Sequence, residues 1–467
     1  MARNIIDKLW DEHLVKELDD GSSLLYIDRI FLHERTGSIA LKGLEAAGRQ
    51  VRNPEQVFCT MDHIVDTFPG RGDDTLMPGG REFITTTRAA ARAAGINLFD
   101  LGDPRQGIVH VVAPEQGIAC PGLTLVCPDS HTCTNGALGA LAWGIGSTEA
   151  EHALVTKTLV LRKPRTMRVR FEGRLGRGVT AKDMILHLIA AHGASGGVGY
   201  AIEFAGEAVR ALPMEARFTL CNMAVEFGAW TGLIAPDEET IAYVRGRPYA
   251  PDAAHWDAAV AHWRTLPSDP GARFDRELLV EAGDIAPQVS WGTSPQHSAP
   301  IDARVPDPAA EPDPQRRQLM ERALEYMALE PGTRLTDIPI QAAFIGSCTN
   351  SRLSDLRRAA GILRGRRVAP GVKAIVVPGS TQVKRAAEAE GLDKLFTEAG
   401  FEWRESGCSM CFFAGGENFG FETRVVSSTN RNFENRQGPR TRTHIASPET
   451  VAASAVSGHL ADPRALD

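Results

Sequence analysis

Short apolar runs alternate along the chain with amphipathic, helix-like stretches, and this alternation constrains the fold more than any other feature of the sequence. The runs typical of buried strands are "GLTLVC", "TMRVRF", "QAAFIGS" and "VKAIVVPGS". The helix-like stretches are "STEAEHALVTKTLVL", "TAKDMILHLIAAHG", "NSRLSDLRRAAGILRG" and "TQVKRAAEAEG", and most begin with Ser, Thr or Asn and end at Gly. This order predicts an α/β protein with largely parallel sheets.

The length of the chain predicts more than one domain. With 467 residues, of which 43% are hydrophobic and 23% charged, the chain can bury several cores and should form two or three domains. Residues 292–314 contain six prolines and no apolar periodicity, which predicts a linker. A weaker boundary falls at "RKPRT", residues 162–166. We therefore expect three α/β domains, over residues 1–165, 166–303 and 304–467.

Charge and cysteine usage exclude several classes of protein. A net charge of −7 argues against a general binder of nucleic acids or membrane surfaces, because such proteins need a concentrated positive field. No window approaches the roughly 18 uncharged apolar residues of a membrane span, and the N-terminal sequence does not resemble an export signal. We expect a cytoplasmic protein. Its eight cysteines are too sparse for a disulfide scaffold, which leaves free thiols and metal thiolates.

Cys348 lies in "AAFIGSCTNSRLSDL", where an apolar strand ends and a helix begins. We expect Asn350 or Ser351 to cap this helix. A sulfur atom beside a helix N-terminus is favoured as thiolate, which suits a metal ligand. For a cysteine considered alone, a buried free thiol is the simpler interpretation.

Cys408 and Cys411 form a Cys-x-x-Cys pair in "SGCSMC". A structural zinc site would need a second pair of ligands at matching spacing, and none follows. A thioredoxin-like dithiol normally lies near the start of a small βαβ domain. Together with Cys348, the pair would provide three thiolates and leave one iron of a 4Fe-4S cluster without a protein sulfur. Such an iron is a Lewis acid that can bind a hydroxyl and a carboxylate.

Two motifs that each combine an aspartate with a nearby histidine follow apolar runs. "TMDHIVDT" contains Asp62 and His63, and "VCPDSHTC" contains Asp129, Ser130 and His131. In a loop, a carboxylate can orient an imidazole and raise its basicity. Two such groups predict an active site. A Ser/His/Asp hydrolase remains an alternative, although the Gly-x-Ser-x-Gly nucleophile elbow is missing.

A polar loop near the end of the chain, "SSTNRNFENRQGPRTRTH", concentrates arginine and asparagine. The residues are Asn430, Arg431, Asn432, Arg436, Arg440 and Arg442. Planar guanidinium groups suit carboxylates, so the loop predicts a site for a small polyanion. A solvated basic loop or an RNA contact is the alternative.

The motifs "MDH", "CPDSHT", "FIGSCTNSR", "GCSMC" and "NRNFENRQG", in this order over nearly the whole chain, resemble those of the aconitase superfamily. The stretches "LCNMAVEFGA" and "KLFTEAGFEWR" are similar to the large subunits of its isopropylmalate dehydratase branch. The resemblance implies a 4Fe-4S cluster held by Cys348, Cys408 and Cys411, with the fourth iron open to substrate.

The resemblance also implies roles for other side chains. Those expected around the open iron, to handle the departing hydroxyl, are Asp62, His63, His110 of "GIVH", Asp129, His131 and Glu203 of "AIEF", with Ser130 in support. Those expected to hold substrate carboxylate are Asn430, Arg431 and Arg436.

The expected reaction is a reversible dehydration and rehydration that converts 2-isopropylmalate to 3-isopropylmalate in leucine biosynthesis. Fused aconitases carry a further swivelling domain, which supplies a base serine and a carboxylate-binding arginine. Because this chain lacks a match to that domain, we expect a heterodimer with a separate small subunit. "CPDSHTCTNGA" and residues 412–429 differ from the usual family sequence around the substrate pocket. They leave open a paralogue acting on citramalate, dimethylmalate, maleate or homoaconitate. A cluster-sensing RNA-binding regulator is the alternative of a different class.

Overall fold

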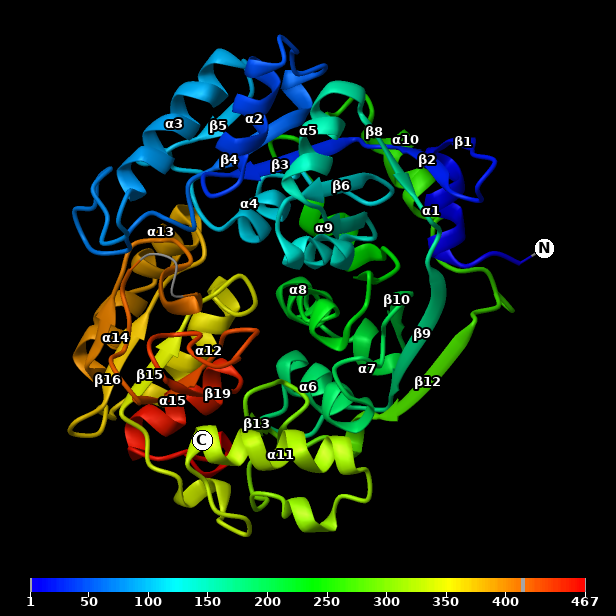
Figure 1. The fold of residues 1–467 in the computed structure, drawn as a ribbon. Coiled ribbons are helices and arrows are strands. Elements are labelled where there is room, and N and C mark those ends of the chain that lie inside the picture. The colour runs from blue at the N-terminus through cyan, green and yellow to red at the C-terminus, as the bar shows by residue number, and fades with distance from the viewer. Residues whose placement is uncertain (1, 413–415, 467) are drawn as a thin grey trace. The chain divides into compact units, whose positions relative to one another are not determined.

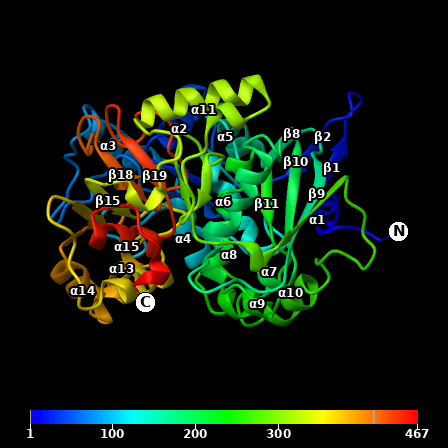
Figure 2. The same ribbon diagram turned by 90° about the horizontal axis from the view of Figure 1, so that it is seen from below.

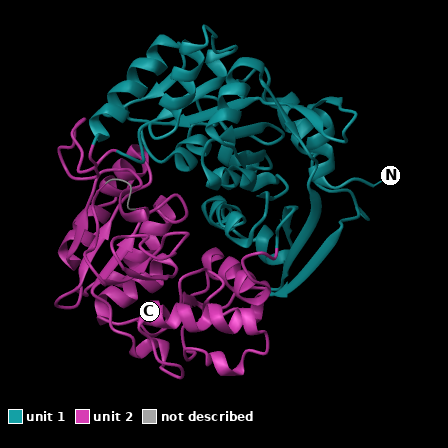
Figure 3. Cartoon of the chain, viewed as in Figure 1, with its two compact units in different colours: residues 1–64, 79–173, 197–281 teal, residues 65–78, 174–196, 282–467 magenta. Residues whose placement is uncertain are grey.

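The computed structural model describes residues 2–412 and 416–466, and it confirms the α/β fold class (Figure 1). The chain divides into two compact units, each built from separate stretches of sequence (Figure 3). Unit 1 comprises residues 1–64, 79–173 and 197–281, and unit 2 comprises residues 65–78, 174–196 and 282–467. Within the described residues, no helix combines the length and apolar character needed to span a membrane.

The first sheet of unit 1 has five parallel strands in the order β5-β4-β3-β6-β7. Its strands are β3 (Arg29–His33), β4 (Val57–Thr60), β5 (Asn97–Phe99), β6 (Thr124–Cys127) and β7 (Leu141–Gly144). Helices α2 (Gly37–Ala46), α3 (Gly80–Ala93) and α4 (Val109–Glu115) and the short helix η2 (Ser130–Leu138) connect them, and α5 (Ser147–Thr156) follows β7. Because the strands are parallel, the segments that follow β3, β4 and β6 leave the sheet at the same edge.

The second sheet of unit 1 has four parallel strands in the order β11-β10-β9-β12, and Figure 2 shows β11, β10 and β9 side by side. Its strands are β9 (Arg165–Glu172), β10 (Tyr200–Ala205), β11 (Thr231–Leu233) and β12 (Arg276–Glu281). The helices near it in sequence are α7 (Glu207–Arg210), α8 (Met214–Asn222), η3 (Val225–Phe227), α9 (Glu238–Val244) and α10 (Trp256–Trp263). A small antiparallel sheet, β1 (Leu14–Glu17), β2 (Ser23–Tyr26) and β8 (Thr158–Leu161), follows helix α1 (Ile5–His13).

The long helix predicted over "STEAEHALVTKTLVL" is wrong for its last five residues, 157–161. Helix α5 ends at Thr156, and Lys157 caps it with φ of 58°, in the left-handed region. The residues "TLVL" then form β8, which pairs antiparallel with β2. Thr and Val are stiff at χ1 and favour strands, so the cross-strand pairing overrides the helical pattern.

Unit 2 contains a five-stranded parallel sheet in the order β17-β16-β15-β18-β19. Its strands are β15 (Ala342–Ile345), β16 (Lys373–Val376), β17 (Phe401–Trp403), β18 (Arg424–Ser427) and β19 (Arg442–Ile445). Helices α12 (Leu353–Leu363), α13 (Thr381–Ala389), α14 (Leu392–Ala399) and α15 (Pro448–Ser457) belong to the same unit, as do α6 (Ala181–His192) and α11 (Pro314–Met327). Phe344, Ile375 and Val377 of this sheet pack with Met410 in one buried cluster.

The predicted linker over residues 292–314 is wrong, because this segment is packed against unit 2. Strand β14 (Ser298–Pro300) pairs antiparallel with β13 (Gln288–Ser290), and the side chains of Ile301 and Val305 are buried. Both strands of this two-stranded sheet are edge strands, where proline is tolerated because one side of the strand forms no ladder hydrogen bonds. Each of the three predicted domains contains one of the three parallel sheets. The two compact units do not follow the predicted domain boundaries, and the three-domain division stays a prediction.

Candidate functional site

An acid–base cluster forms in unit 1 where β4 and β6 end. Asp62 and His63 follow β4, and Asp129 follows β6. Strands β4 and β6 flank β3 in the parallel sheet and bring these loops to one edge, where His110 of α4 and His131 of η2 join them. The structure thus brings together five of the predicted residues, Asp62, His63, His110, Asp129 and His131, within one hydrogen-bonded group.

His63 lies between two carboxylates. Its Nδ1 is 2.6 Å from Asp62 Oδ1, and its Nε2 is 3.4 Å from Asp129 Oδ2. Burial alone would lower the pKa of His63, but the charges and hydrogen bonds of Asp62 and Asp129 outweigh it and raise that pKa well above its ordinary value. His63 is therefore an imidazolium at neutral pH, and it can act as a proton donor through Nε2.

Asp129 contacts three histidines of this cluster, His63, His110 and His131. Its carboxylate accepts hydrogen bonds from His110 Nε2 and from the backbone N–H of His131, both at 2.8 Å. Burial would raise the pKa of Asp129, but the neighbouring imidazoles of His110, His131 and His63 hold it well below its usual range. Asp129 is ionised throughout the physiological range and orients the rings around it.

A functional residue that the sequence analysis missed is Glu226. Its Oε1 lies 2.9 Å from Nε2 of His131, so a carboxylate orients this imidazole as well. Glu226 belongs to η3 and to the stretch "LCNMAVEFGA", whose similarity to the family was the available signal. Ser130 is exposed, with its Oγ 3.5 Å from Nδ1 of His131.

Glu203, the other predicted acid–base carboxylate, does not join this cluster. It lies buried in β10, and its Oε2 accepts a 2.6 Å hydrogen bond from Ser268 Oγ. Burial raises the pKa of Glu203, while Ser268, Arg168 and Lys8 lower it. These partners tie β10 to its surroundings, which is a structural role.

The three predicted ligand cysteines follow strands of the same sheet in unit 2 and are together called the thiol cluster below. Cys348 follows β15, and Cys408 and Cys411 follow β17, so all three leave the carboxyl edge of one parallel sheet. All three are buried, and the N–H of Cys411 donates to the carbonyl of Cys408 at 2.9 Å. Met410, between the paired cysteines, anchors the loop in the core of the sheet.

The cysteine loops contain strained backbone held by side-chain contacts. Ser347 and Ser409 have φ of 80° and 45°, in the left-handed region that residues other than glycine rarely adopt. The hydroxyl of Ser347 lies 3.0 Å from the sulfur of Cys411, and Ser409 Oγ accepts from Thr67 Oγ1 at 3.0 Å. Such strain persists only where the surrounding structure imposes it, and it is concentrated at functional sites.

Two side chains of the predicted polyanion loop donate to the cysteine sulfurs. Asn430 Nδ2 is 3.4 Å from Cys348 Sγ, and Arg436 Nη2 is 3.7 Å from Cys411 Sγ. Arg436 is buried, with its guanidinium 4.7 Å from the centre of the Phe412 ring. N–H donors of this kind orient sulfur atoms that serve as metal ligands.

The remaining residues of that loop have different environments. Arg431 is half-buried. Arg440 and Arg442 pair with Glu422 at 3.0 and 3.5 Å, and Asn432 donates to the Gly292 carbonyl at 2.6 Å. Arg440, Arg442 and Asn432 thus make contacts within the protein, and carboxylate binding by Asn430, Arg431 and Arg436 stays a prediction. The atypical stretch 412–429 includes residues 413–415, which lie outside the described residues.

The predicted cap of the helix after Cys348 is also wrong. Helix α12 begins at Leu353, and Asp355 accepts the N–H of Arg352 at 3.1 Å. Asn350 instead donates through Nδ2 to Asp355 at 3.0 Å. Asp355 competes for the cap because it can satisfy the first orphan N–H from within the first turn.

Lys182 of α6, which sequence reasoning did not single out, ties the loop after β15 to the loop after β18. Its fully buried Nζ donates to the carbonyls of Ser428 and Thr429 at 2.8 and 2.6 Å and to Asn350 Oδ1 at 3.2 Å. Burial lowers the pKa of Lys182 to about 7. No sequence signal marks a lysine in an otherwise amphipathic helix as buried.

The residues present fit an iron–sulfur cluster. Three buried cysteines on one sheet edge, with N–H donors directed at two of their sulfurs, supply ligands of the type that Fe–S clusters take. The other five cysteines are buried thiols, and burial raises the pKa of Cys59, Cys127 and Cys221 well above its ordinary value. Those three are protonated structural thiols.

The sequence profile of the aconitase family (aconitate hydratase) matches residues 7–458, and the chain belongs to this family of hydro-lyases. An iron–sulfur cluster follows from that membership. The chain is also 54% identical over 466 residues to the 3-isopropylmalate dehydratase large subunit 1 of Bradyrhizobium diazoefficiens, with 100% of this chain and 97% of that protein covered. Among solved structures, aconitase X of Thermococcus kodakaraensis in its holo form aligns with 92% of this chain and 88% of its own, at a TM-score of 0.46 and 14% identity.

Proposed function

We propose that this chain is the large subunit of a 3-isopropylmalate dehydratase, which converts 2-isopropylmalate to 3-isopropylmalate by reversible dehydration in leucine biosynthesis. The observation that carries the proposal is the 54% identity to such a large subunit over the whole chain. The acid–base cluster and the thiol cluster support it, because this chemistry needs both proton transfer and a Lewis acid.

In this proposal Cys348, Cys408 and Cys411 hold a 4Fe-4S cluster through three thiolates. When bound, the cluster supplies a Lewis-acidic iron that polarises the substrate hydroxyl. Arg436 and Asn430 neutralise and orient the thiolates on Cys411 and Cys348. The strained serines beside the cysteines keep the loops in one conformation, which lowers the reorganisation needed on cluster binding.

The acid–base cluster moves the protons of the dehydration. His63 carries a proton that two carboxylates stabilise, and we assign to it the protonation of the departing hydroxyl. Asp129 fixes the orientation of His63 and His110. His131, oriented by Glu226, is a second proton carrier for the reverse hydration.

Substrate carboxylates are assigned to Asn430, Arg431 and Arg436, since guanidinium groups recognise carboxylates with two parallel hydrogen bonds. We further propose a separate small subunit that supplies a base serine for the carbon-bound proton and another carboxylate-binding arginine. Without it the chain should bind the cluster but not complete the reaction. The proposed setting is the cytoplasm.

The test is anaerobic reconstitution of the chain with iron and sulfide, addition of a dehydratase small subunit, and an absorbance assay of alkene formation. The substrates are 2-isopropylmalate, citramalate, dimethylmalate, maleate and homoaconitate. Turnover of 2-isopropylmalate above the others supports the proposal. Turnover of another substrate with none of 2-isopropylmalate moves the assignment to a paralogous hydro-lyase. Absence of all turnover, with tight RNA binding by the cluster-free chain, indicates a regulator.

A further inference from the structure

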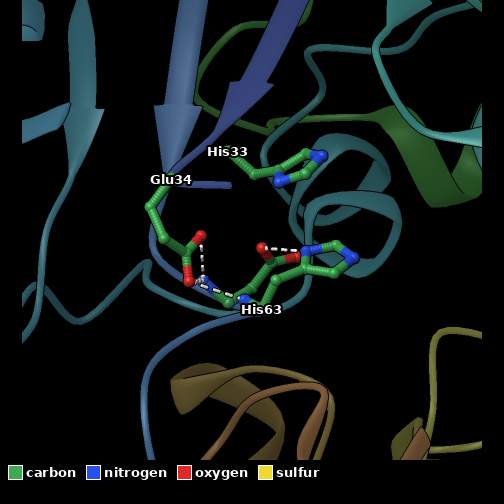
Figure 4. Close-up of side chains that lie close together, drawn as sticks. His33, Glu34 and His63 are labelled. Atoms are coloured by element: carbon green, nitrogen blue, oxygen red, sulfur yellow. Dashed lines mark hydrogen bonds and ion pairs between the residues drawn. The ribbon is translucent and has the colours of Figure 1, made fainter. Parts of the chain in front are cut away.

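One group of side chains beside the acid–base cluster has the composition of a metal site. Ligand atoms of His33, Glu34, Asp62 and His63 lie within 4.8 Å of one another (Figure 4). However, Asp62 Oδ1 already bonds His63 Nδ1 at 2.6 Å, and the Glu34 oxygens face backbone N–H groups. A cation would have to displace these donors, so the arrangement indicates a hydrogen-bonded support and not a metal centre.

Glu34 accepts hydrogen bonds from three consecutive backbone N–H groups. Its Oε1 lies 3.0 Å from the nitrogen of Asp62, 2.7 Å from that of His63 and 2.5 Å from that of Ile64. Its Oε2 is also 3.0 Å from the nitrogen of Asp62. The side chain is fully buried, so these bonds are shielded from competing water.

The sheet explains why this side chain reaches that loop. Strands β3 and β4 are parallel neighbours, with His33 opposite Thr60. Glu34 is the first residue beyond β3 and therefore emerges beside the loop that follows β4. Its own carbonyl accepts a 3.1 Å hydrogen bond from Thr87 Oγ1 of α3, a contact that is separate from those of its carboxylate.

The contacts fix the two reactive side chains from several sides. Holding the N–H groups of Asp62 and His63 sets the backbone from which the Asp–His pair projects. The second Asp62 oxygen accepts the N–H of Val109 at 2.9 Å. The ring of His33 stacks on that of His63, with 4.2 Å between centroids and 25° between planes.

We propose that Glu34 is a positioning residue for the acid–base reaction: its carboxylate holds the Asp62–His63 loop through three backbone hydrogen bonds and so keeps the two side chains aligned. His33 completes the support by stacking on His63. The catalytic consequence rests on the proposed function, whereas the alignment of Asp62 and His63 does not.

The titratable groups that face His63 are Asp62, Asp129, Glu34 and His33. Burial raises the pKa of Glu34 to about 7, the charge of Asp62 adds to this rise, and the backbone N–H bonds oppose it. Burial and the His63 charge lower the pKa of His33 to about 4, so His33 is a neutral ring. A neutral ring can stack on the His63 imidazolium without repelling it.

The direct test is Glu34→Leu in the full-length chain. Leucine keeps much of the bulk of the side chain but has no acceptor, so the N–H groups of residues 62–64 lose the carboxylate oxygen that accepts all three of them. We expect the proton affinity of His63 to fall at least about tenfold, because the imidazole loses its alignment with Asp62. Titration by NMR of histidine-labelled protein measures this, with the His63 signal assigned by its loss in His63→Gln.

Thr87→Val is the matched control, because it removes the bond to the Glu34 carbonyl and leaves the carboxylate contacts intact. We expect its His63 titration to match the wild type. In the holoenzyme, Glu34→Leu should lower kcat about tenfold or more with little change in KM, and Thr87→Val should not. An unshifted His63 titration in Glu34→Leu, or an equal shift in both variants, would overturn the proposal.

A measurement on the wild type keeps the test independent of how the variants fold. Hydrogen exchange of the peptide that spans Asp62 to Ile64 should show strong protection, although this segment is a loop. Exchange at the rate of an open loop would contradict the proposal. If the proposed function fails, no variant will turn over 2-isopropylmalate, yet the His63 shift and the protection will remain.

Discussion

Gln437 makes a testable connection between the thiol cluster and the sheet of unit 2. It is fully buried, and its Nε2 donates to the carbonyl of Met410 at 2.6 Å, in the loop between Cys408 and Cys411. Its Oε1 accepts from Thr443 Oγ1 at 3.0 Å. We predict that Gln437→Leu, which preserves bulk and removes these bonds, lowers the free energy of unfolding of unit 2 and speeds the loss of iron from the iron–sulfur cluster.

The expected magnitude follows from the groups left without a partner. The Met410 carbonyl and the Thr443 hydroxyl each lose a buried hydrogen bond, at about 1–3 kcal/mol per group. The hydroxyl can rotate to other acceptors, so we expect a loss of about 2–4 kcal/mol in the free energy of unfolding. If about 2 kcal/mol of this is lost locally, opening of the Cys408–Cys411 loop becomes about 30-fold more favourable.

The assay is the rate of iron release to a chelator from anaerobically reconstituted protein, beside denaturation with urea. Asn432→Leu is the matched control, because Asn432 makes comparable buried bonds to Ser290, Gly292 and Thr443 and none to the cysteine loops. Both variants should lose stability, and only Gln437→Leu should release iron at least about tenfold faster. Equal release rates from the two variants, at equal loss of stability, would refute the reasoning.

Three further predictions test other parts of the structure. Glu226→Gln should lower kcat about 100-fold with little change in KM, because it removes the carboxylate that orients His131, and wild-type steady-state kinetics in this variant would contradict the assignment. Glu203→Gln should leave kcat nearly unchanged and lower the thermal midpoint, since Glu203 bonds Ser268 outside the acid–base cluster, and a large loss of kcat without a change in stability would restore its catalytic role. Burial lowers the pKa of His444 to about 3, so between pH 6.5 and 3 the unfolded chain binds a proton that the folded chain does not, and stability falls as the pH falls by up to about 1.4 kcal/mol per unit from this residue. Urea denaturation at several pH values should show a shallower decline in His444→Asn, and parallel curves for both proteins would argue against this contribution.

The fold class and the cysteine loops could be predicted from the sequence because their signals are local. The apolar run "AAFI" forms β15, and the following turn places Cys348 at the carboxyl edge of the sheet. The predicted element boundaries were wrong where tertiary contacts, and not the local sequence, decide where a helix or strand ends. Lys157 caps α5 in the left-handed conformation, and the residues that follow pair with β2 instead of continuing the helix.

The acid–base residues show the limit of sequence reasoning more sharply. Adjacent Asp62 and His63 could be recognised as a pair, whereas Glu226 is 95 residues from His131 and only the fold brings them together. Glu203 and Glu226 both lie in family-like stretches, and nothing local distinguishes the carboxylate that meets an imidazole from the one that meets Ser268. Glu34 acts on backbone N–H groups, which leave no side-chain partner to find in the sequence.

The central claim is that three thiolates of this chain hold a four-iron cluster with one iron open to substrate. Mössbauer spectroscopy of the chain reconstituted with ⁵⁷Fe, with its small subunit and with or without 2-isopropylmalate, tests it most directly. We predict that about one quarter of the iron signal, the part from the iron without a cysteine, changes when substrate is added, and that Cys348→Ser shows no four-iron spectrum. A wild-type spectrum that substrate leaves unchanged, or a full four-iron spectrum in Cys348→Ser, would contradict the claim.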